Sequence, residues 1–250
     1  MKESKRKFWL HGLTGRMGQA ISSHVKSEKD CHWVCVGGSS LEIPLKINDS
    51  SFQSTELLID FSSAKANESL FKDLKESHFI PKNILICTTG VSKENITSWI
   101  RLADEHKINL MFAANTSLGI ALMLKSSLSI APQFLKRGFD VEIEETHHKM
   151  KIDSPSGTAS YLAENLAEEN QLKIINSRNA PREKRELGIH SIRGGGVYGE
   201  HKVRFLGDHE ELVITHKAYS RNLFAAGTFV LADWLSEQES GFYELKDAFE

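Results

Sequence analysis

The stretch Phe8-Trp9-Leu10-His11-Gly12-Leu13-Thr14-Gly15-Arg16-Met17-Gly18 decides the fold of this chain. A short apolar run predicts a strand, the glycines predict a turn, and an apolar period through Ile21 and Val25 predicts a helix. Glycine permits a sharp turn and lets the backbone approach a pyrophosphate. The order therefore predicts a dinucleotide site. The spacing G-x-x-G-x-x-G differs from G-x-G-x-x-G, and a tight turn without a ligand is the alternative.

The pattern of strand and helix continues beyond this turn to about Ala114. Helix-like stretches such as 64–75 and 94–106 alternate with apolar strand-like runs at 33–36, 57–61, 84–87 and 110–113. Such alternation is typical of an α/β fold with a Rossmann-type parallel doubly wound sheet.

After Asn115 the pattern changes. A long apolar run at 118–130 predicts a buried helix, and only one further helix, at 158–170, lies among the strands expected near 141–145, 189–193, 203–206 and 211–216. This region is therefore expected to be a second, α+β domain that carries an open mixed sheet. The polar, proline-containing stretch 171–185 is expected to be a mobile loop, and 224–235 has a helical period.

Composition limits the class of protein. The chain has 250 residues, 40% of them hydrophobic, and a net charge of −2, which suits one or two domains with a substantial core and gives no field that would recruit nucleic acid. The basic start precedes too few apolar positions for a secretory signal, and we expect no membrane span and a cytoplasmic protein. Cys31, Cys35 and Cys87 include no Cys-x-x-Cys pair and are expected to be buried thiols, with neither zinc nor disulfides.

A second segment carries the chemistry: His147-His148-Lys149-Met150-Lys151-Ile152-Asp153-Ser154-Pro155-Ser156-Gly157-Thr158. It combines two imidazoles, two ammonium groups and a helix start, whose free N–H groups attract a carboxylate or phosphate. The alternation Val141-Glu142-Ile143-Glu144 predicts a half-buried strand just before it, so His147 and Lys151 are expected in a strand-to-helix connection. The alternative is a solvated basic loop beside a helix cap.

With these two segments the chain resembles the 4-hydroxy-tetrahydrodipicolinate reductase (dihydrodipicolinate reductase) family of the diaminopimelate route to lysine. Further motifs match in family order: Leu58-Ile59-Asp60-Phe61-Ser62, Cys87-Thr88-Thr89-Gly90, Phe112-Ala113-Ala114-Asn115-Thr116-Ser117-Leu118-Gly119, Gly199-Glu200-His201 and Ile214-Thr215-His216-Lys217-Ala218. The resemblance implies a discontinuous dinucleotide-binding domain, 1–114 with 218–250, and a substrate-binding and oligomerisation domain, 115–217. It also implies a homotetramer and a small dicarboxylate as substrate.

The activity that the resemblance implies is reduction of 4-hydroxy-tetrahydrodipicolinate to tetrahydrodipicolinate, with hydride transfer to ring C4 and protonation at C3. It places His147 as proton donor and acceptor and Lys151 as proton donor. His148 would hold one substrate carboxylate, and Gly157 and Thr158 the other. Adjacent residues of an extended strand point to opposite faces, so His147 and His148 are not expected to bind a metal as a pair, and no metal site is predicted.

Arg193 is a candidate clamp for a substrate carboxylate, because a planar guanidinium binds carboxylates bidentately. Its alternative role is to anchor the neighbouring glycine-rich loop. The matching motifs also contain His201, His216 and Lys217, for which bracing of the sheet is the alternative to a role in the site.

For the cofactor, the glycine turn would cradle the pyrophosphate, and residues after two later strands would reach the nicotinamide side. The expected cofactor residues are Gly12, Leu13, Thr14, Gly15, Arg16, Met17, Gly18, Ser39, Ser40, Cys87, Thr88, Thr89, Ala113, Ala114, Asn115 and Thr116. The stretch Val36-Gly37-Gly38-Ser39-Ser40 lacks the carboxylate that grips the ribose in NAD sites. We therefore predict NADPH, with NADH possible, and Ser39 and Ser40 as candidate phosphate donors.

Two other functions fit parts of the sequence. Another two-domain NAD(P)-dependent amino-acid dehydrogenase would share the glycine turn but would not need His147 and Lys151 joined to an anion-binding helix start. A non-catalytic nucleotide-sensing module would need no aligned proton donor.

Overall fold

The computed structural model describes residues 5–28 and 31–248, which divide into two compact units. One unit joins the described residues up to Thr116 with those from Asn222 onward, and the other is Ser117–Arg221. The chain therefore leaves the first unit and returns to it. The chain crosses between the units after Thr116 and after Arg221, a few residues later than the expected junctions at 114 and 217.

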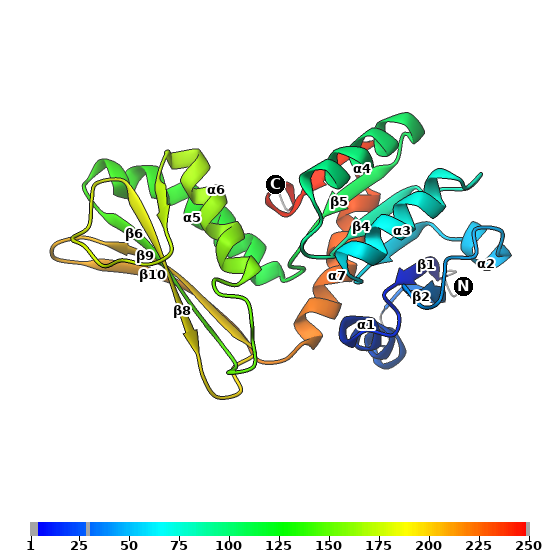
Figure 1. Cartoon of the computed structure of the whole chain (residues 1–250), viewed down its shortest axis with the longest axis horizontal. Coiled ribbons are helices and arrows are strands. Elements are labelled where there is room, and N and C mark those ends of the chain that lie inside the picture. The colour runs from blue at the N-terminus through cyan, green and yellow to red at the C-terminus, as the bar shows by residue number, and fades with distance from the viewer. Residues whose placement is uncertain (1–4, 29–30, 249–250) are drawn as a thin grey trace. The chain divides into compact units, whose positions relative to one another are not determined.

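The first unit is built on a parallel sheet of six strands in the order β11-β5-β4-β3-β1-β2. Helices α1 and α7 pack together on one face, and α3 and α4 pack together on the other (Figure 1). The strands are β1 (Arg6–His11), β2 (Trp33–Ser39), β3 (Leu57–Asp60), β4 (Asn83–Ile86), β5 (Asn109–Phe112) and β11 (Gly241–Glu244). The helices are α1 (Arg16–Ser27), α2 (Ser50–Gln53), α3 (Ala64–Lys75), α4 (Lys93–His106), α7 (Asn222–Ser236) and the 3-10 turn η1 (Leu245–Asp247).

This arrangement confirms the Rossmann-type parallel sheet. Strands β3 and β4 are buried at every residue, as expected for parallel strands covered by helices on both faces. Their apolar side chains join one core in which Trp9 and Trp99 are buried. Strand β11 was not predicted, because Gly241-Phe242-Tyr243-Glu244 lacks the continuous aliphatic run that indicated the equally short β3 and β4.

The second unit is a mixed sheet in the order β10-β9-β6-β8-β7, with β6, β7 and β8 parallel to one another and β9 and β10 antiparallel to their neighbours. Its strands are β6 (Asp140–His147), β7 (Lys173–Ile175), β8 (Glu186–Arg193), β9 (Gly199–Leu206) and β10 (Glu211–Ala218). Its helices are α5 (Leu118–Lys136) and α6 (Gly157–Asn170). The open mixed sheet is confirmed.

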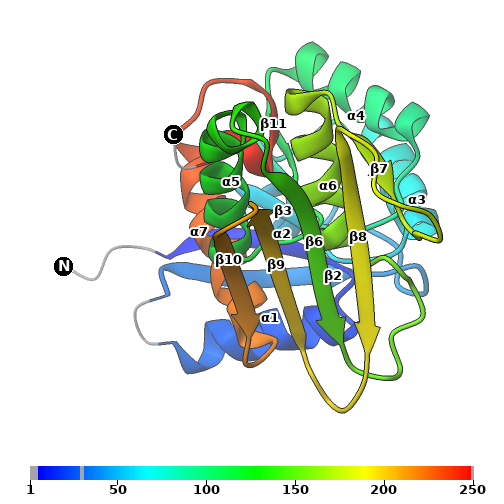
Figure 2. The same ribbon diagram turned by 90° about the vertical axis from the view of Figure 1, so that its left-hand side faces the viewer.

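Both helices of the second unit lie on one face of its sheet. Strand β6 alternates accordingly: Val141 and Ile143 are buried, while Glu142 and Glu144 are partly exposed. The opposite face, seen in Figure 2, is covered by no helix within the described part of this unit. Charged side chains form ion pairs across it, such as Glu144 with Lys202 at 2.6 Å.

Helix α5 corrects the expectation that no stretch could span a membrane. Its 19 residues are apolar enough by length and hydropathy to do so. In the structure α5 packs on α6 and on strands of the sheet, and Phe134 stacks on Phe205 with ring centroids 5.0 Å apart. One side of the helix is therefore packed in the core of this unit.

The stretch 171–185, expected to be a mobile loop, instead contains β7 and is tied to the sheet. Arg178 forms an ion pair with the buried Glu186, and Arg182 with the partly buried Glu142. Sequence reasoning identified the polarity of this segment correctly but not its partners, which belong to β6 and β8.

Candidate functional site

The expected cofactor residues gather at one edge of the parallel sheet. They follow the carboxyl ends of β1, β2, β4 and β5, and these ends lie together because the strands are parallel. This edge is where open α/β sheets bind ligands. The residues after β3, Phe61 and Ser62, lie at the same edge, and sequence reasoning assigned them no role.

The glycine turn packs against this edge so closely that two of its positions admit no side chain. Gly12 has φ of +88°, and a Cβ there would lie 2.4 Å from the Phe61 carbonyl oxygen. A Cβ on Gly18 would lie 2.3 Å from the Gly12 carbonyl oxygen. Thr14, Gly15 and Arg16 at the tip of the turn are exposed.

The start of α1 suits a nucleotide phosphate. Its cap residue, Gly15, has no side chain to accept from the first N–H groups. In α3, α4, α5 and α6 a serine hydroxyl accepts such a bond instead. The N–H groups and dipole at the start of α1 are therefore available to an anion. The residues present fit a dinucleotide.

Ser39 requires a correction. Its side chain is fully buried, and its hydroxyl lies 3.0 Å from Trp9 Nε1 and 2.7 Å from His11 Nδ1. It therefore does not face a ligand as a phosphate donor. Ser40 is buried, and its hydroxyl accepts from the Ile43 N–H at 3.1 Å.

The residues after β4 and β5 divide into structural and exposed ones. Thr88 accepts from the Ser62 N–H at 3.0 Å, and the Thr116 hydroxyl donates to the Phe224 carbonyl at 2.7 Å. Thr89 and Ala114 are exposed at the edge of the sheet. Cys87 is buried, and burial raises its pKa well above the ordinary value for a thiol.

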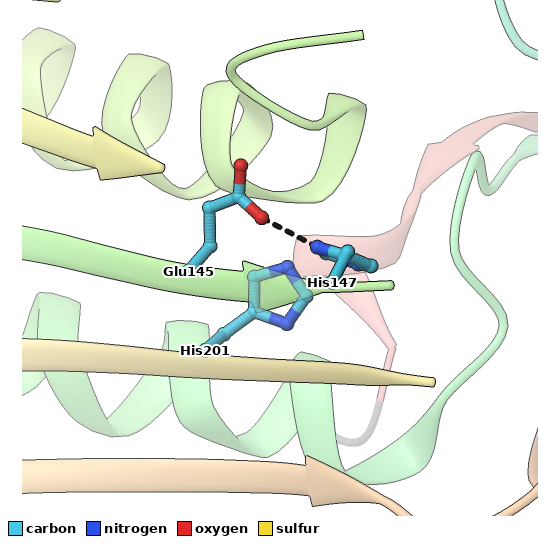
Figure 3. Close-up of side chains that lie close together, drawn as sticks. All are labelled: Glu145, His147 and His201. Atoms are coloured by element: carbon cyan, nitrogen blue, oxygen red, sulfur yellow. Dashed lines mark hydrogen bonds and ion pairs between the residues drawn. The ribbon is translucent and has the colours of Figure 1, made fainter. Parts of the chain in front are cut away.

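The second set of residues lies in the other unit, at the carboxyl end of β6. Figure 3 shows Glu145 and His147 on β6 beside His201 on β9, with Glu145 hydrogen-bonded to Nδ1 of His147. Glu145 is fully buried, and the rings of His147 and His201 meet edge to face with centroids 5.2 Å apart. His147 is thus the last residue of the strand rather than part of the loop that follows.

Arg193 binds the carboxylate of Glu145 bidentately, as its planar guanidinium permits. Nη1 lies 2.9 Å from Glu145 Oε2, and Nη2 lies 2.6 Å from Oε1. Nη2 also donates to the Asp153 carbonyl at 2.6 Å. The structure therefore places Arg193 on a protein carboxylate that the sequence interpretation did not consider.

The loop between β6 and α6 carries further predicted residues of this unit. Ser156 caps α6, and its own N–H donates to Glu145 Oε1 at 3.2 Å. Lys151 Nζ lies 2.9 Å from Asp153 Oδ1. His148 is anchored by its backbone N–H, which donates to the Val197 carbonyl at 2.8 Å.

The charges at this site shift its pKa values. Burial raises the pKa of Glu145, but hydrogen bonds from Arg193 and His147 outweigh it and lower the pKa to about 2. Burial lowers the pKa of His147, with Glu145 opposing and the Lys151 cation adding to the fall. Burial lowers the pKa of His201 to about 3. At neutral pH the carboxylate is therefore ionised and both imidazoles are neutral.

The ligand atoms of Glu145, His147 and His201 all lie within 4.8 Å of one another, a spacing that could hold a metal ion. Both oxygens of Glu145 already accept from Arg193, however, and a guanidinium on the same carboxylate repels a cation. We interpret the cluster as a hydrogen-bonded network.

Sequence reasoning missed Glu145, although the sequence carried a signal. In the alternation of β6, the positions of Val141 and Ile143 face the helices, and Glu145 and His147 continue that phase. A carboxylate at a buried position of a strand needs a partner, and an imidazole two residues further on the same face is a natural one.

The sequence matches known proteins along nearly its whole length. Residues 6–116 match the family model for the dihydrodipicolinate reductase N-terminus, and residues 119–249 match the model for its C-terminus. The chain is 36% identical over 242 residues to the 4-hydroxy-tetrahydrodipicolinate reductase of Alkaliphilus oremlandii, covering 95% of this chain and 96% of that protein. It is also 36% identical to the enzyme of the same name from Campylobacter jejuni, covering 96% and 98%.

Solved structures agree on the fold. A dihydrodipicolinate reductase from Paenisporosarcina sp. TG-14, solved with dipicolinate bound, superposes with a TM-score of 0.75 at 22% identity over 98% of this chain and 100% of that one. A DAP dehydrogenase of C. glutamicum superposes with a TM-score of 0.52 at 10% identity, covering 98% and 94%. The two-unit architecture is thus shared with a DAP dehydrogenase, whereas the two relatives named above, at 36% identity, carry the reductase name.

Proposed function

Since this chain belongs to the dihydrodipicolinate reductase family, we propose that it reduces 4-hydroxy-tetrahydrodipicolinate to tetrahydrodipicolinate in diaminopimelate and lysine biosynthesis. The family is one of NAD(P)H oxidoreductases, and the bound cofactor would supply a hydride to ring C4. The observation that carries the proposal for this chain is the cluster of His147, Lys151 and the α6 start around Glu145 and Asp153.

The proton for ring C3 would come from Lys151. In neutral His147 the ring proton is on the nitrogen that meets Glu145, because a carboxylate can only accept, so Nε2 has a lone pair and no proton to give. Lys151 is a cation within electrostatic reach of His147. His147 would then act at Nε2, taking up a proton and returning it to Lys151.

The substrate carboxylates would bind to His148 on one side and to Gly157 and Thr158 on the other. Gly157 begins α6, and N–H groups at a helix start bind anions. Dipicolinate, the molecule bound in the Paenisporosarcina structure, is a planar dicarboxylate and is the natural probe for this pocket.

We further propose that NADPH is the preferred cofactor, that NADH is accepted, and that the protein acts in the cytoplasm. The stretch 36–40 carries no carboxylate to repel a 2′-phosphate. The expected result is a higher kcat/KM with NADPH than with NADH, and a clear preference for NADH in steady-state assays would contradict it.

The test of the reaction follows NADPH oxidation by absorbance with substrate freshly made by the coupled synthase. We expect Lys151→Ala and His147→Ala to lower kcat by about 10²- to 10⁴-fold, the usual contribution of general acid–base catalysis. Lys149→Ala, which removes an exposed lysine of the same loop, is the matched control and should retain activity. Full turnover in both site variants, or none in the wild type, would rule the proposal out and favour a nucleotide-sensing role.

A further inference from the structure

We propose that Glu145 and Arg193 form a positioning pair that holds His147 with its proton on Nδ1 and leaves Nε2 as the atom that exchanges protons. This inference rests on the proposed function and names the residues that prepare its acid–base group. Neither residue would touch the substrate, so both would act through the imidazole.

The Glu145 carboxylate is held by several hydrogen bonds. Oε2 meets Nδ1 of His147 and Nη1 of Arg193, and Oε1 accepts from Nη2 of Arg193 and from the Ser156 N–H. Its side chain is fully buried. A carboxylate fixed in this way cannot rotate away, and because it only accepts, the proton between it and the ring belongs to Nδ1.

Arg193 is fixed in turn. Besides the two bonds to Glu145, its guanidinium donates to the carbonyls of Asp153 at 2.6 Å and Ile192 at 2.8 Å. Arg193 ends β8, and its Cα is the register partner of His147 on β6. Strand pairing therefore brings the cation to the carboxylate and keeps that carboxylate ionised.

Gly199 leaves room on the other side of the ring. It begins β9, next to the end of β6, and a Cβ at this position would lie 3.0 Å from Nε2 of His147 and 3.4 Å from Cδ2. The absence of a side chain keeps the Nε2 edge of the imidazole clear. The ring is thus held at Nδ1 and open at Nε2, the arrangement that a positioned general base requires.

The charges around His147 fit the same role. The groups that face it are Glu145 from its own strand, Arg193 from β8, His201 from β9 and Lys151 from the following loop. Of these four, Glu145 alone is an anion. It can stabilise the imidazolium that forms when Nε2 takes a proton, while the Arg193 and Lys151 cations oppose that charge and His201 is neutral.

A purely structural role for Glu145 is the competing explanation, because the ion pair with Arg193 also joins β6 to β8. The two explanations differ in what they predict for the imidazole. A positioning pair determines the tautomer of His147, and its loss acts only when His147 is present. A structural pair affects stability and activity whatever residue occupies position 147.

The first measurement needs no turnover. Wild-type protein labelled with ¹⁵N-histidine is studied by NMR near neutral pH, and the His147 signals are assigned by their absence from His147→Gln. We expect a protonated Nδ1 and an unprotonated Nε2. A ring whose proton resides on Nε2 would overturn the inference, even if the protein also fails to reduce the proposed substrate.

The second measurement uses Glu145→Gln, which keeps the shape of the side chain and removes its charge. We expect kcat to fall by about 10²-fold, the lower range of general acid–base effects, with a much smaller change in KM. Glu168→Gln, an exposed carboxylate on α6, is the matched control and should behave like wild type.

A double-mutant cycle separates the two explanations. If Glu145 acts through His147, Glu145→Gln should add less than about a twofold loss in the His147→Ala background. Equal losses in both backgrounds would mean a structural role and would overturn the inference. If Glu145→Gln does not fold, Glu145→Asp takes its place, because it keeps the charge but draws it back by one methylene. The tautomer of His147 in Glu145→Asp is then compared with that in wild type, in place of the double-mutant cycle. A wild type without turnover would instead refute the proposed function and leave the NMR result to decide.

Discussion

At the scale of single residues, Asp153 binds two groups that the proposed function reserves for the substrate, the Lys151 ammonium and the Gly157 N–H. Its carboxylate pairs with Lys151 at 2.9 Å. Burial raises the pKa of Asp153, but the hydrogen bond and charge of Lys151, together with the Gly157 N–H, outweigh it and lower the pKa. A protein carboxylate therefore stands where a substrate carboxylate is expected, and it must yield when the substrate binds.

Asp153→Asn should accordingly strengthen binding of dipicolinate. The side chain is 55% exposed, and exposed ion pairs are worth about 0.2–1 kcal/mol, so we expect a gain of up to about fivefold in affinity by calorimetry. Asp208→Asn, in an exposed turn of the same unit, is the control. Weaker binding in Asp153→Asn would instead mean that Asp153 serves to orient Lys151.

His201 provides a pH dependence whose sign is fixed by its burial. An unfolded histidine titrates near 6.5, whereas burial lowers the pKa of His201 in the fold to about 3. As the pH falls from 6.5 toward 3, the unfolded chain binds a proton that the folded chain refuses. The stability that His201 contributes is therefore complete above pH 6.5 and is lost by up to about 1.4 kcal/mol per pH unit below it.

The measurement compares the free energy of unfolding of wild type and His201→Asn in urea at pH 7.5 and pH 5.5. His11, His147 and His216 also have lowered pKa values through burial, so the comparison with the variant isolates His201. We expect the difference in free energy of unfolding between wild type and His201→Asn to change by about 1.4 kcal/mol, to the disadvantage of wild type, from pH 7.5 to pH 5.5. The same advantage at both pH values would contradict the assignment.

At the scale of elements, the turn between β1 and α1 depends on glycine for two separate reasons. Gly12 has a positive φ, and its α-carbon also faces the Phe61 carbonyl so closely that a Cβ would lie 2.4 Å away. Gly138 shares the first property, with φ of +86°, but a Cβ there would meet nothing within 4 Å. The two positions form a natural pair for comparison.

Gly12→Ala should therefore cost more than Gly138→Ala in urea unfolding. A positive φ costs a residue with a side chain about 1–2 kcal/mol, and overpacking adds typically about 1–3 kcal/mol, so we expect the difference at Gly12 to reach at least 1 kcal/mol. NADPH binding, followed by fluorescence, should also be lost only in Gly12→Ala. Equal costs would show that the contact with Phe61 relaxes freely.

At the scale of the whole molecule, the open face of the second sheet bears on assembly. That face carries ion pairs of Glu144, Lys202, Glu200 and Lys217, and no helix covers it among the residues described in Ser117–Arg221. We propose that copies of the chain meet there to form a homotetramer, as the family resemblance implies. A contact about a twofold axis would place this face of one copy against the same face of another.

Light scattering coupled to gel filtration checks this proposal. For wild type we expect a mass four times that of the 28.1 kDa chain. The double charge reversal Lys202→Glu with Lys217→Glu leaves carboxylates facing carboxylates, so we expect a lower mass for that variant. Glu168→Gln on the helix side should leave the mass unchanged. A wild type with the mass of one chain would exclude the assembly.

The sequence by itself determined the elements and their order. Apolar periods of two and of about 3.6 residues are local, so they locate strands and helices without knowledge of the partners. The glycine turn located the first crossover of the parallel sheet, and the break in pattern after Asn115 located the second unit. No signal in the sequence indicated β7 or β11, because neither carries the continuous apolar run by which the short strands β3, β4 and β5 were predicted.

Only the tertiary structure decided which side chains meet. Arg193 is 48 residues from Glu145 in sequence, and it reaches that carboxylate because β8 pairs with β6 in one particular register. The same is true of Ser39, which looked available for a phosphate but is enclosed by Trp9 and His11 once β1 and β2 pair. Pairing between strands is set by burial summed over the whole sheet, and no local pattern of residues contains that sum.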